Sequence, residues 1–315
     1  MSGFFHAWRK IMSSGASIAT FIVEETTPGE TPDPATWDTL RLTGNTLTPN
    51  VSTEVSAEIR ETRMQGGGII TSLDYSGDLA GEMSAGTFDK LLEAAFYGTW
   101  ATDVLEIGAD RHTFTIVKAF KDIGVYSTFK GVHIGAMQLD IPEEGKVTCS
   151  FTGMGLGYED GEADPTAAGT VNPQTTTVAM GSATSVGDIL VDGATLAGEA
   201  CISALSMSID NTLQTQRCLG KAGPGALIAT SANVSGSLTM AWSKAAWNQW
   251  KKMLTREAIG VSFPLTDAAG NSYTFELPEI EIDGELPDGG NEDIVQVSLN
   301  YTAKNTPIKV TRVLV

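Results

Sequence analysis

Short runs of alternating hydrophobic and polar residues recur along the chain and predict many β-strands. In such a run every second side chain lies on a buried face, and the side chains between them lie on an exposed face. Many apolar positions are valine, isoleucine, phenylalanine or tryptophan, which fit a pleated sheet well. Candidate strands cover residues 17–23, 51–63, 113–116, 132–141, 147–153, 205–217, 273–277, 280–283 and 294–303. We therefore expect a mainly β protein.

A strand followed by an amphipathic helix occurs twice, which indicates a weak internal repeat. In the first half we expect Ser84 to cap a helix whose apolar face begins at Phe88. In the second half Ser243 precedes a similar helix, and the offset between Phe88 and its counterpart is 159 positions. The apolar face of this second helix is expected to consist of Trp247, Trp250 and Leu254.

The strands upstream of the two helices also match. Residues 51–63 resemble residues 205–217 at an offset of 154 positions. Since this offset is five positions shorter than that of the helices, we expect the two intervening loops to differ by five residues.

The repeat and the stretches without periodicity divide the chain. Residues 159–182 are rich in glycine, threonine, proline and alanine, and they predict a linker or an extended connection. The first domain is then 17–158 and the second is 183–305. Residues 1–16 and 306–315 have no counterpart in the repeat, so we expect two terminal arms, the second with one more strand. Apolar termini of this kind often pack on another subunit.

Charge and composition exclude several classes of protein. The 315 residues include 20 Lys and Arg against 38 Asp and Glu, which gives a net charge of −18 and argues against a protein that grips phosphates. The three cysteines are odd in number and show no C-x-x-C spacing, so neither a disulfide framework nor a zinc site is indicated. No window approaches the roughly 20 apolar residues of a membrane-spanning helix. We expect synthesis in the cytoplasm, without a signal peptide or membrane insertion.

No combination of residues indicates catalysis. The run Gly66-Gly67-Gly68 lacks the Lys-Ser/Thr of a phosphate-binding loop, and Ser127 with Lys130 lacks the partner motifs of a serine nucleophile. The three histidines have no acidic or cysteine partner at ligand spacing. The acidic loop at 283–293 matches no calcium-binding register, which favours a solvated turn. We expect no enzyme activity, cofactor or metal.

Acidic residues follow the exposed positions of several candidate strands. The pattern alone favours an ordinary solvated surface. The more specific hypothesis is an acidic wall that lines a space and does not bind what passes through it. The carboxylates concerned are Glu54, Glu58, Asp74, Asp78, Glu279, Glu281 and Asp283.

Several segments carry a resemblance to a known family. They are VEETTPGETP at 23–32, LTGNTLTPN at 42–50, EIR at 58–60, LLEAAFYGTW at 91–100, TIVKAFKDIG at 115–124, YSTFKG at 126–131 and LSMSIDN at 205–211. In this order they resemble the major tail tube proteins of long-tailed, siphovirus-like bacteriophages. The resemblance runs from about residue 17 to about residue 305.

The resemblance implies a β-sandwich or half-barrel in each domain, flanked by one helix, whose inner sheet joins those of neighbouring subunits to close a ring. Rings stack into a hollow tube through which the genome passes into the host. In this family single-domain members form hexameric rings and duplicated members form trimeric rings, so the repeat implies a trimer with a pseudo-sixfold wall. The implied partners are copies of the chain, the tail tip, tape measure and tail terminator proteins, and passing double-stranded DNA that is not bound specifically. The implied location is the tail of the virion.

The family resemblance gives the acidic residues and one loop a role. Carboxylates on the inner wall would repel the phosphates of the genome. A long hairpin loop of each domain grips the adjacent ring in this family, and residues 61–71 and 220–229 occupy its place. The candidates for this contact are Met64, Gln65, Gly66, Gly67 and Gly68 in the first loop, and Lys221 and Pro224 in the second. Whether both loops make the same contact stays open.

Two alternatives remain. The tube of a contractile tail or of a secretion-type injection system shares the fold, although it usually has a single domain. A carbohydrate-binding phage adhesin domain would be acidic and rich in glycine too, but it would expose tryptophans, whereas Trp247 and Trp250 are expected on an apolar helix face.

Overall fold

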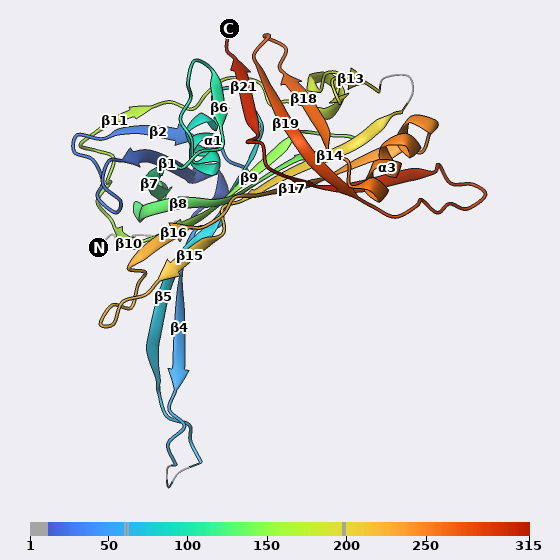
Figure 1. Ribbon diagram of the computed structural model, residues 1–315. Helices are drawn as coiled ribbons and strands as arrows, with labels where there is room; N and C mark the ends of the chain where they lie inside the picture. Colours follow the sequence, from blue (N-terminus) through green and yellow to red (C-terminus); the bar gives the residue numbers. More distant parts are fainter. Residues whose placement is uncertain (1–11, 60, 62, 197–199) are drawn as a thin grey trace, which may run out of the picture.

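The computed structural model describes residues 12–59, 61, 63–196 and 200–315, and strands dominate this part of the chain (Figure 1). The mainly β architecture expected from the alternating pattern is confirmed. From the N-terminus, the elements of the first half are η1 (Gly15–Ser17), β1 (Ile18–Glu25), β2 (Thr36–Leu40), β3 (Gly44–Asn45), β4 (Thr48–Val55), β5 (Gly68–Glu82), α1 (Asp89–Phe96), β6 (Val104–Glu106), β7 (Thr113–Phe120), β8 (Val125–Ile141) and β9 (Thr148–Gly155). They are followed by β10 (Gly157–Gly161), β11 (Thr170–Asn172), α2 (Ser182–Ser185), β12 (Leu190–Val191), β13 (Ala194–Thr195), β14 (Ile202–Asp210), β15 (Leu213–Gln216), β16 (Ala226–Ala229), β17 (Asn233–Ala241), α3 (Lys244–Thr255), β18 (Ile259–Thr266), β19 (Ser272–Asp283), β20 (Gln296–Ala303) and β21 (Lys309–Val313).

A row of antiparallel strands, which we call the wall, crosses both halves of the chain. Its order is β5, β9, β8, β14, β17, β20 and β19. The halves meet where β14 pairs with β8, from Leu205 opposite Ile141 to Asp210 opposite Ala136. Backbone hydrogen bonding therefore continues from one half into the other.

Both halves follow the same order of pairing. In the first half β4 pairs with β5, β5 with β9, β9 with β8 and β8 with β7. In the second half β14 pairs with β17, β17 with β20, β20 with β19 and β19 with β18. A helix follows β5 and β17, and the two helices end at left-handed residues, Tyr97 and Arg256.

The prediction that the two loops upstream of the helices differ by five residues is wrong. Thr48 opposes Ser76 and Ser208 opposes Ser235, so the loops span 28 and 27 positions. By this pairing the upstream strands correspond at an offset of 160 positions, whereas the sequence match placed them at 154. The two offsets differ by an even number, which keeps every side chain on the same face and leaves the alternating pattern unchanged.

The main hydrophobic core lies on one side of the wall. Side chains at every second position are buried there, and they include Leu79, Met137, Leu139, Phe151, Met207, Leu238 and Leu299. The first part of β8 leaves the wall and pairs with β7 and β10, in a second sheet that also contains β1, β2 and β11. A small separate core around Trp37 and Phe21 packs in this second sheet.

The two helices differ from expectation in different ways. Helix α1 begins at Asp89 and not directly after Ser84, whose hydroxyl instead pairs with that of Thr87 at 2.7 Å. Helix α3 follows Ser243 directly, as expected, and the Ser243 hydroxyl caps it by accepting the N–H of Ala246 at 3.1 Å.

The apolar face expected for α3 is not buried. Trp247 and Leu254 are 41% and 67% exposed, and only Ala246 of this helix is buried. In α1 five residues are buried, and its carbonyl at Ala95 accepts a hydrogen bond from Asn211 of the second half. Helix α1 thus packs in the core and contacts the second half through Asn211, whereas α3 lies at the far end of the chain's wall (Figure 1).

The segment predicted as a linker is an extended connection that is fixed to the first half. Strand β11 within it pairs in parallel with β2, and the Arg41 guanidinium donates to the carbonyls of Thr175 and Thr177. Met180 is fully buried and bonds through its backbone to Met83 and Val147.

The predicted C-terminal arm is also part of the fold. Strand β21 pairs with β19 on one side and with β6 on the other, and Ile308 and Val310 are buried. This segment was expected to lie outside the core because it has no counterpart in the repeat, but it joins the two halves. Most of the N-terminal arm lies outside the described residues, and the backbone N–H of Ser14 bonds to Asp122 at 2.6 Å.

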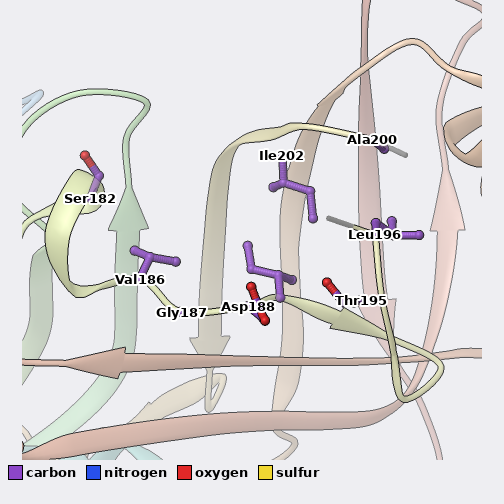
Figure 2. A pocket seen from close by; sticks show the side chains of 9 residues that line it. Ser182, Val186, Gly187, Asp188, Thr195, Leu196, Ala200 and Ile202 are labelled. Atoms are coloured by element: carbon purple, nitrogen blue, oxygen red, sulfur yellow. The ribbon is translucent and has the colours of Figure 1, made fainter. Parts of the chain in front are cut away.

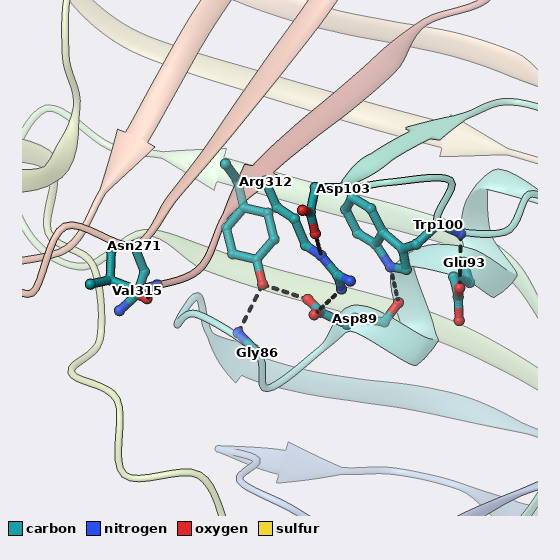
Figure 3. A network of polar contacts seen from close by, with 9 residues as sticks. Gly86, Asp89, Glu93, Trp100, Asp103, Asn271, Arg312 and Val315 are labelled. Atoms are coloured by element: carbon teal, nitrogen blue, oxygen red, sulfur yellow. Dashed lines mark hydrogen bonds and ion pairs between the residues drawn. The ribbon is translucent and has the colours of Figure 1, made fainter.

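A network around Asp89 fastens β21 to α1 (Figure 3). The Arg312 guanidinium donates to Asp89 at 2.6 Å and to Asp103 at 3.0 Å, and it lies 4.3 Å from the centre of the Trp100 ring. The Tyr273 hydroxyl donates to Asp89 and accepts the N–H of Gly86 at 2.8 Å. Burial raises the pKa of Tyr273, so the hydroxyl remains a donor.

Replacing Arg312 with Met should lower the free energy of unfolding by about 2 kcal/mol, because Asp89 is left largely buried without its cation. Urea unfolding monitored by circular dichroism measures this loss. The matched control on the same strand is Lys309→Met, which breaks the more exposed pair with Glu276 and should cost less than about 1 kcal/mol. Equal losses in the two variants would contradict the role given to Arg312.

Candidate functional site

One face of the wall packs on the core, and the other, which we call the open face, presents small polar side chains. Residues that lie opposite each other in neighbouring strands are on the same face of the wall, for example Asp78 opposite Thr152 and Ser206 opposite Ser237. The open face consists of Asp74, Ser76, Asp78, Ala80 and Glu82 of β5, Thr148, Ser150, Thr152 and Met154 of β9, Ala136, Gln138 and Asp140 of β8, Ala204, Ser206, Ser208 and Asp210 of β14, Ser235, Ser237, Thr239 and Ala241 of β17, Gln296, Ser298, Asn300 and Thr302 of β20, and Glu281 and Asp283 of β19.

Hydroxyl and amide groups dominate the open face, and neither lysine nor arginine occurs at these positions. Many of the polar groups bond to one another within the face. The Thr152 hydroxyl donates to Asp78 at 2.7 Å, Gln138 donates to Asp140 at 2.9 Å, and the hydroxyls of Ser206 and Ser237 are 2.8 Å apart. The result is a mainly polar surface whose own positions carry no positive charge.

Among the described residues, positive side chains pair with carboxylates near the ends of this surface. Arg217 pairs with Asp74 at 2.6 Å, and Lys146 pairs with Glu82 at 2.6 Å. Glu281 binds both Lys304 and Arg256, and these hydrogen bonds hold the pKa of its carboxyl below the ordinary value.

Four further carboxylates give the open face its net negative charge. Among the described residues, none of Asp78, Asp140, Asp210 and Asp283 forms an ion pair. Asp140 and Asp210 stand on the strands that join the two halves, so negative charge continues across the junction.

The structure brings together only part of the acidic set predicted from the sequence. Asp74, Asp78, Glu281 and Asp283 lie on the open face. Glu279 lies beside an irregularity, where the buried positions of β19 change from odd to even. Glu54 and Glu58 lie outside the wall, on the hairpin described next. The sequence reasoning missed Asp140 and Asp210, although each alternates with buried apolar neighbours in the same way.

Strands β4 and β5 continue past the wall as a two-stranded projection, which we call the arm and define as residues 51–73 (Figure 1). An isolated pair of strands is only marginally stable in water, and exposed apolar ribbons are typical contact surfaces. The candidates Met64, Gln65, Gly66, Gly67 and Gly68 lie here, with Met64 largely exposed. The exposed apolar side chains of the arm are Val51, Val55, Ile59, Met64, Ile69 and Ile70.

The corresponding hairpin of the second half, with strands β15 and β16, folds back against the base of the arm. Ala222 accepts the N–H of Leu73 at 2.9 Å, and Gly223 approaches the ring of Tyr75. The other two loop candidates, Lys221 and Pro224, therefore lie beside β5 and not on a second arm. Two hairpins of nearly equal length thus take up different positions.

A cleft of about 250 Å³ lies between α2, β12, β13 and the start of β14 (Figure 2). Its described lining is largely apolar, and its polar side chains are Ser182, Asp188 and Thr195. Ser182 lies apart from the other two in Figure 2, and no histidine, cysteine or lysine belongs to the described lining. These groups do not form a nucleophile with a neighbouring base.

The wall and the arm both fall within a single family match. Residues 15–303 match the family model described as phage tail tube protein. The chain belongs to the phage tail tube protein family. It is therefore a structural subunit that assembles into the tail tube of a virion. No curated protein matches this chain.

The described residues of this tail tube protein show neither a metal site nor a membrane-spanning helix. No group of three or more histidine, cysteine, aspartate or glutamate side chains there is arranged to hold a metal ion. Within the same residues, no helix has the length and apolar character needed to cross a membrane.

Gly236 and Tyr301 pack against each other in the second half of the wall of the tail tube protein. They face each other on β17 and β20, and the buried Tyr301 hydroxyl donates to the carbonyl of Ser206 at 2.7 Å. Burial raises the pKa of this hydroxyl, which stays protonated. A side chain at Gly236 would fill the space that the hydroxyl uses, since its Cβ would overlap both the Tyr301 hydroxyl and the Ser206 carbonyl oxygen.

Gly236→Ala should therefore lower the free energy of unfolding of the tail tube protein by about 3 kcal/mol, because either the strand or the tyrosine must move. Thermal or urea unfolding measures the change. Ser235→Ala, the neighbouring substitution on the exposed face, is the control and should stay within about 0.5 kcal/mol of the wild type. A Gly236→Ala protein as stable as the control would contradict this packing.

Proposed function

We propose that the open face of the wall lines the lumen of the tail tube, and that three copies of the chain close each ring. The shared order of strand pairing in the two halves supports a duplication of one tube unit. Three chains then supply six units around the ring. The internal β8–β14 junction supports this arrangement, since one unit already extends the sheet of the other.

The composition of the open face carries the proposal. Proteins bind double-stranded DNA mainly through lysine and arginine side chains, which neutralise the phosphates and release the counterions condensed on the DNA. A surface of hydroxyls, amides and carboxylates without lysine or arginine offers the DNA no such contact, and its negative charge repels the phosphates. The lumen is thus a conduit through which the genome passes without binding, and the role is mechanical and not enzymatic.

The arm supplies the contact between successive rings. It projects from the wall, and its isoleucines, valines and methionine are exposed in the single chain. Burial of such side chains against the next ring would release about 25 cal/mol per Å² of apolar surface. The duplicated unit favours the long, non-contractile type of tail, and the tube ends would bind the tail tip with its tape measure protein and the tail terminator protein.

Charge reversal on the open face tests the luminal assignment. Lysine in place of Asp78, Asp140, Asp210 and Asp283 should leave tubes intact but slow DNA release from virions several-fold, because the new cations bind passing phosphates. The measurement is the rate of dye-detected DNA release from triggered particles. Raising the salt concentration should restore part of the rate, since it screens these contacts.

The matched control reverses the same number of charges away from the open face. Glu30, Asp33, Asp160 and Glu162 are exposed residues of the second sheet and its loops, and their replacement by lysine should leave release unchanged. Intact tubes with the four open-face lysines that release DNA at the wild-type rate would remove the luminal assignment.

Shortening the arm tests its role in stacking. Deletion of residues 65–68 should give a chain with the wild-type melting temperature that fails to form long tubes, because these residues adjoin the last strand pair of the arm. Circular dichroism and negative-stain electron microscopy measure the two properties. The control is Leu219→Ser on the folded-back hairpin, which removes a fully exposed apolar side chain and should leave tube length unchanged. Long tubes from the deletion variant would count against the arm.

A further inference from the structure

The wall of a single chain ends in two unpaired strand edges. At one end β3 and β4 pair with β5, and their other edge has no strand partner among the described residues. At the other end, the last residues of β19, from Glu281 to Asp283, pair only with β20. Unpaired edges of this kind are templates for a further strand.

The junction inside the chain shows how two such edges fit together. There β14, the strand that corresponds to β3 and β4, pairs with the end of β8, the strand that corresponds to β19. Ser208 lies opposite Gln138, Met207 opposite Leu139 and Asp210 opposite Ala136. This internal pairing therefore serves as a template for the two free edges.

The pairings within each half fix the correspondence residue by residue. Thr48 corresponds to Ser208, because they face Ser76 and Ser235, which are equivalent in β5 and β17. At the other edge Asp283 corresponds to Ala136, because they face Asn300 and Thr152. Gly284, the next residue after Asp283, still lies beside β20, since a Cβ on it would lie 3.0 Å from the Leu299 side chain.

Positions that are buried at the internal junction are exposed at the free edges. Leu139 and Ala95 are fully buried, and Asn211 is nearly so. Their counterparts Leu286, Leu254 and Val51 are 60%, 67% and 55% exposed. Three apolar side chains thus lie in solvent where the template places contacts between units, and their burial would stabilise a pairing of the two edges.

We propose that residues 46–50 of one chain pair with residues 283–287 of the next copy, in an antiparallel register that places Thr48 opposite Glu285 and Leu47 opposite Leu286. This inference rests on the proposed ring of identical chains and specifies its seam. Val51 of one copy then contacts Leu254 at the end of α3 of the other, as Asn211 contacts the end of α1 within the chain.

Two features of the β3–β4 edge oppose pairing with a wrong partner. The N–H of Leu47 is held by the side chain of Asn45 at 3.0 Å, and Pro49 has no N–H to donate. Proline and a blocked donor weaken an edge as a general template. The seam consequently depends on apolar contacts between Val51 of one copy and Leu254 of the other, and on the burial of Leu286 of that second copy. Only the correct partner provides these contacts.

Cysteine cross-linking between two singly substituted chains tests the register. The background carries Cys201→Ser and Cys218→Ser, since both cysteines are exposed, and keeps the buried Cys149. One chain carries Thr48→Cys and the other Glu285→Cys, and the two are assembled together into tubes and oxidised. Covalent dimers are then counted on a non-reducing gel.

The matched control replaces Glu285→Cys by Asp283→Cys, which lies two positions away on the same face. Directly opposed residues have Cβ atoms about 4.5–5.5 Å apart, whereas diagonal neighbours are about 7–8 Å apart. Disulfides need a Cβ separation of about 3.5–4.5 Å, so dimers with Glu285→Cys should exceed those with Asp283→Cys at least several-fold. Unassembled chains at the same concentration should give only background dimers.

The outcomes separate the seam from the proposed function. Tubes that give no cross-link, or equal cross-linking of the two pairs, would overturn the register and leave the tube role intact. A background protein that forms no hollow tube, even with a tail-tip complex present, would contradict the proposed ring itself and the seam with it.

Discussion

The backbone hydrogen bonds of the wall are the interaction on which the rest of the structure depends. Every strand between β5 and β19 is paired on both sides, so the cost of unpaired donors and acceptors falls on the two ends of the row. Within the chain that cost is removed once, where β14 extends the sheet at β8. In the proposed ring, each remaining edge lies beside an edge of the next copy, and apolar contacts supplement the backbone pairing there.

Strand alternation couples this hydrogen bonding to function. Because successive side chains point to opposite faces, one row of strands can bury Leu79, Met207 and Leu299 in the core while it presents Asp78, Ser208 and Asn300 outside. The core face supplies stability through apolar burial. Packing in the core therefore does not constrain the side chains of the open face. Under the proposed luminal assignment, this face needs small polar groups and no cations.

The sequence predicted whatever depends on local alternation and failed where long-range packing decides. Asp74, Asp78, Glu281 and Asp283 could be placed on one face because period-two patterns specify faces. Glu54 and Glu58 share that pattern, but β4 leaves the wall as an arm, and nothing in the local pattern marks that point. The burial of α1 and the exposure of Trp247 and Leu254 on α3 depend on which half lies next to each helix. The ion pair between Arg312 and Asp89 joins residues more than two hundred positions apart, which no local pattern reveals.

The symmetry of the assembled ring tests the central claim most directly. Electron microscopy of purified rings and short tubes, viewed along the axis and classified without imposed symmetry, gives the number of chains and the shape of the inner wall. The structure leads us to expect threefold rings with six similar lobes, and with the polar strands of the wall innermost around an open channel. Sixfold rings of whole chains, or chains that stay monomeric in the presence of a tail-tip initiator, would contradict it.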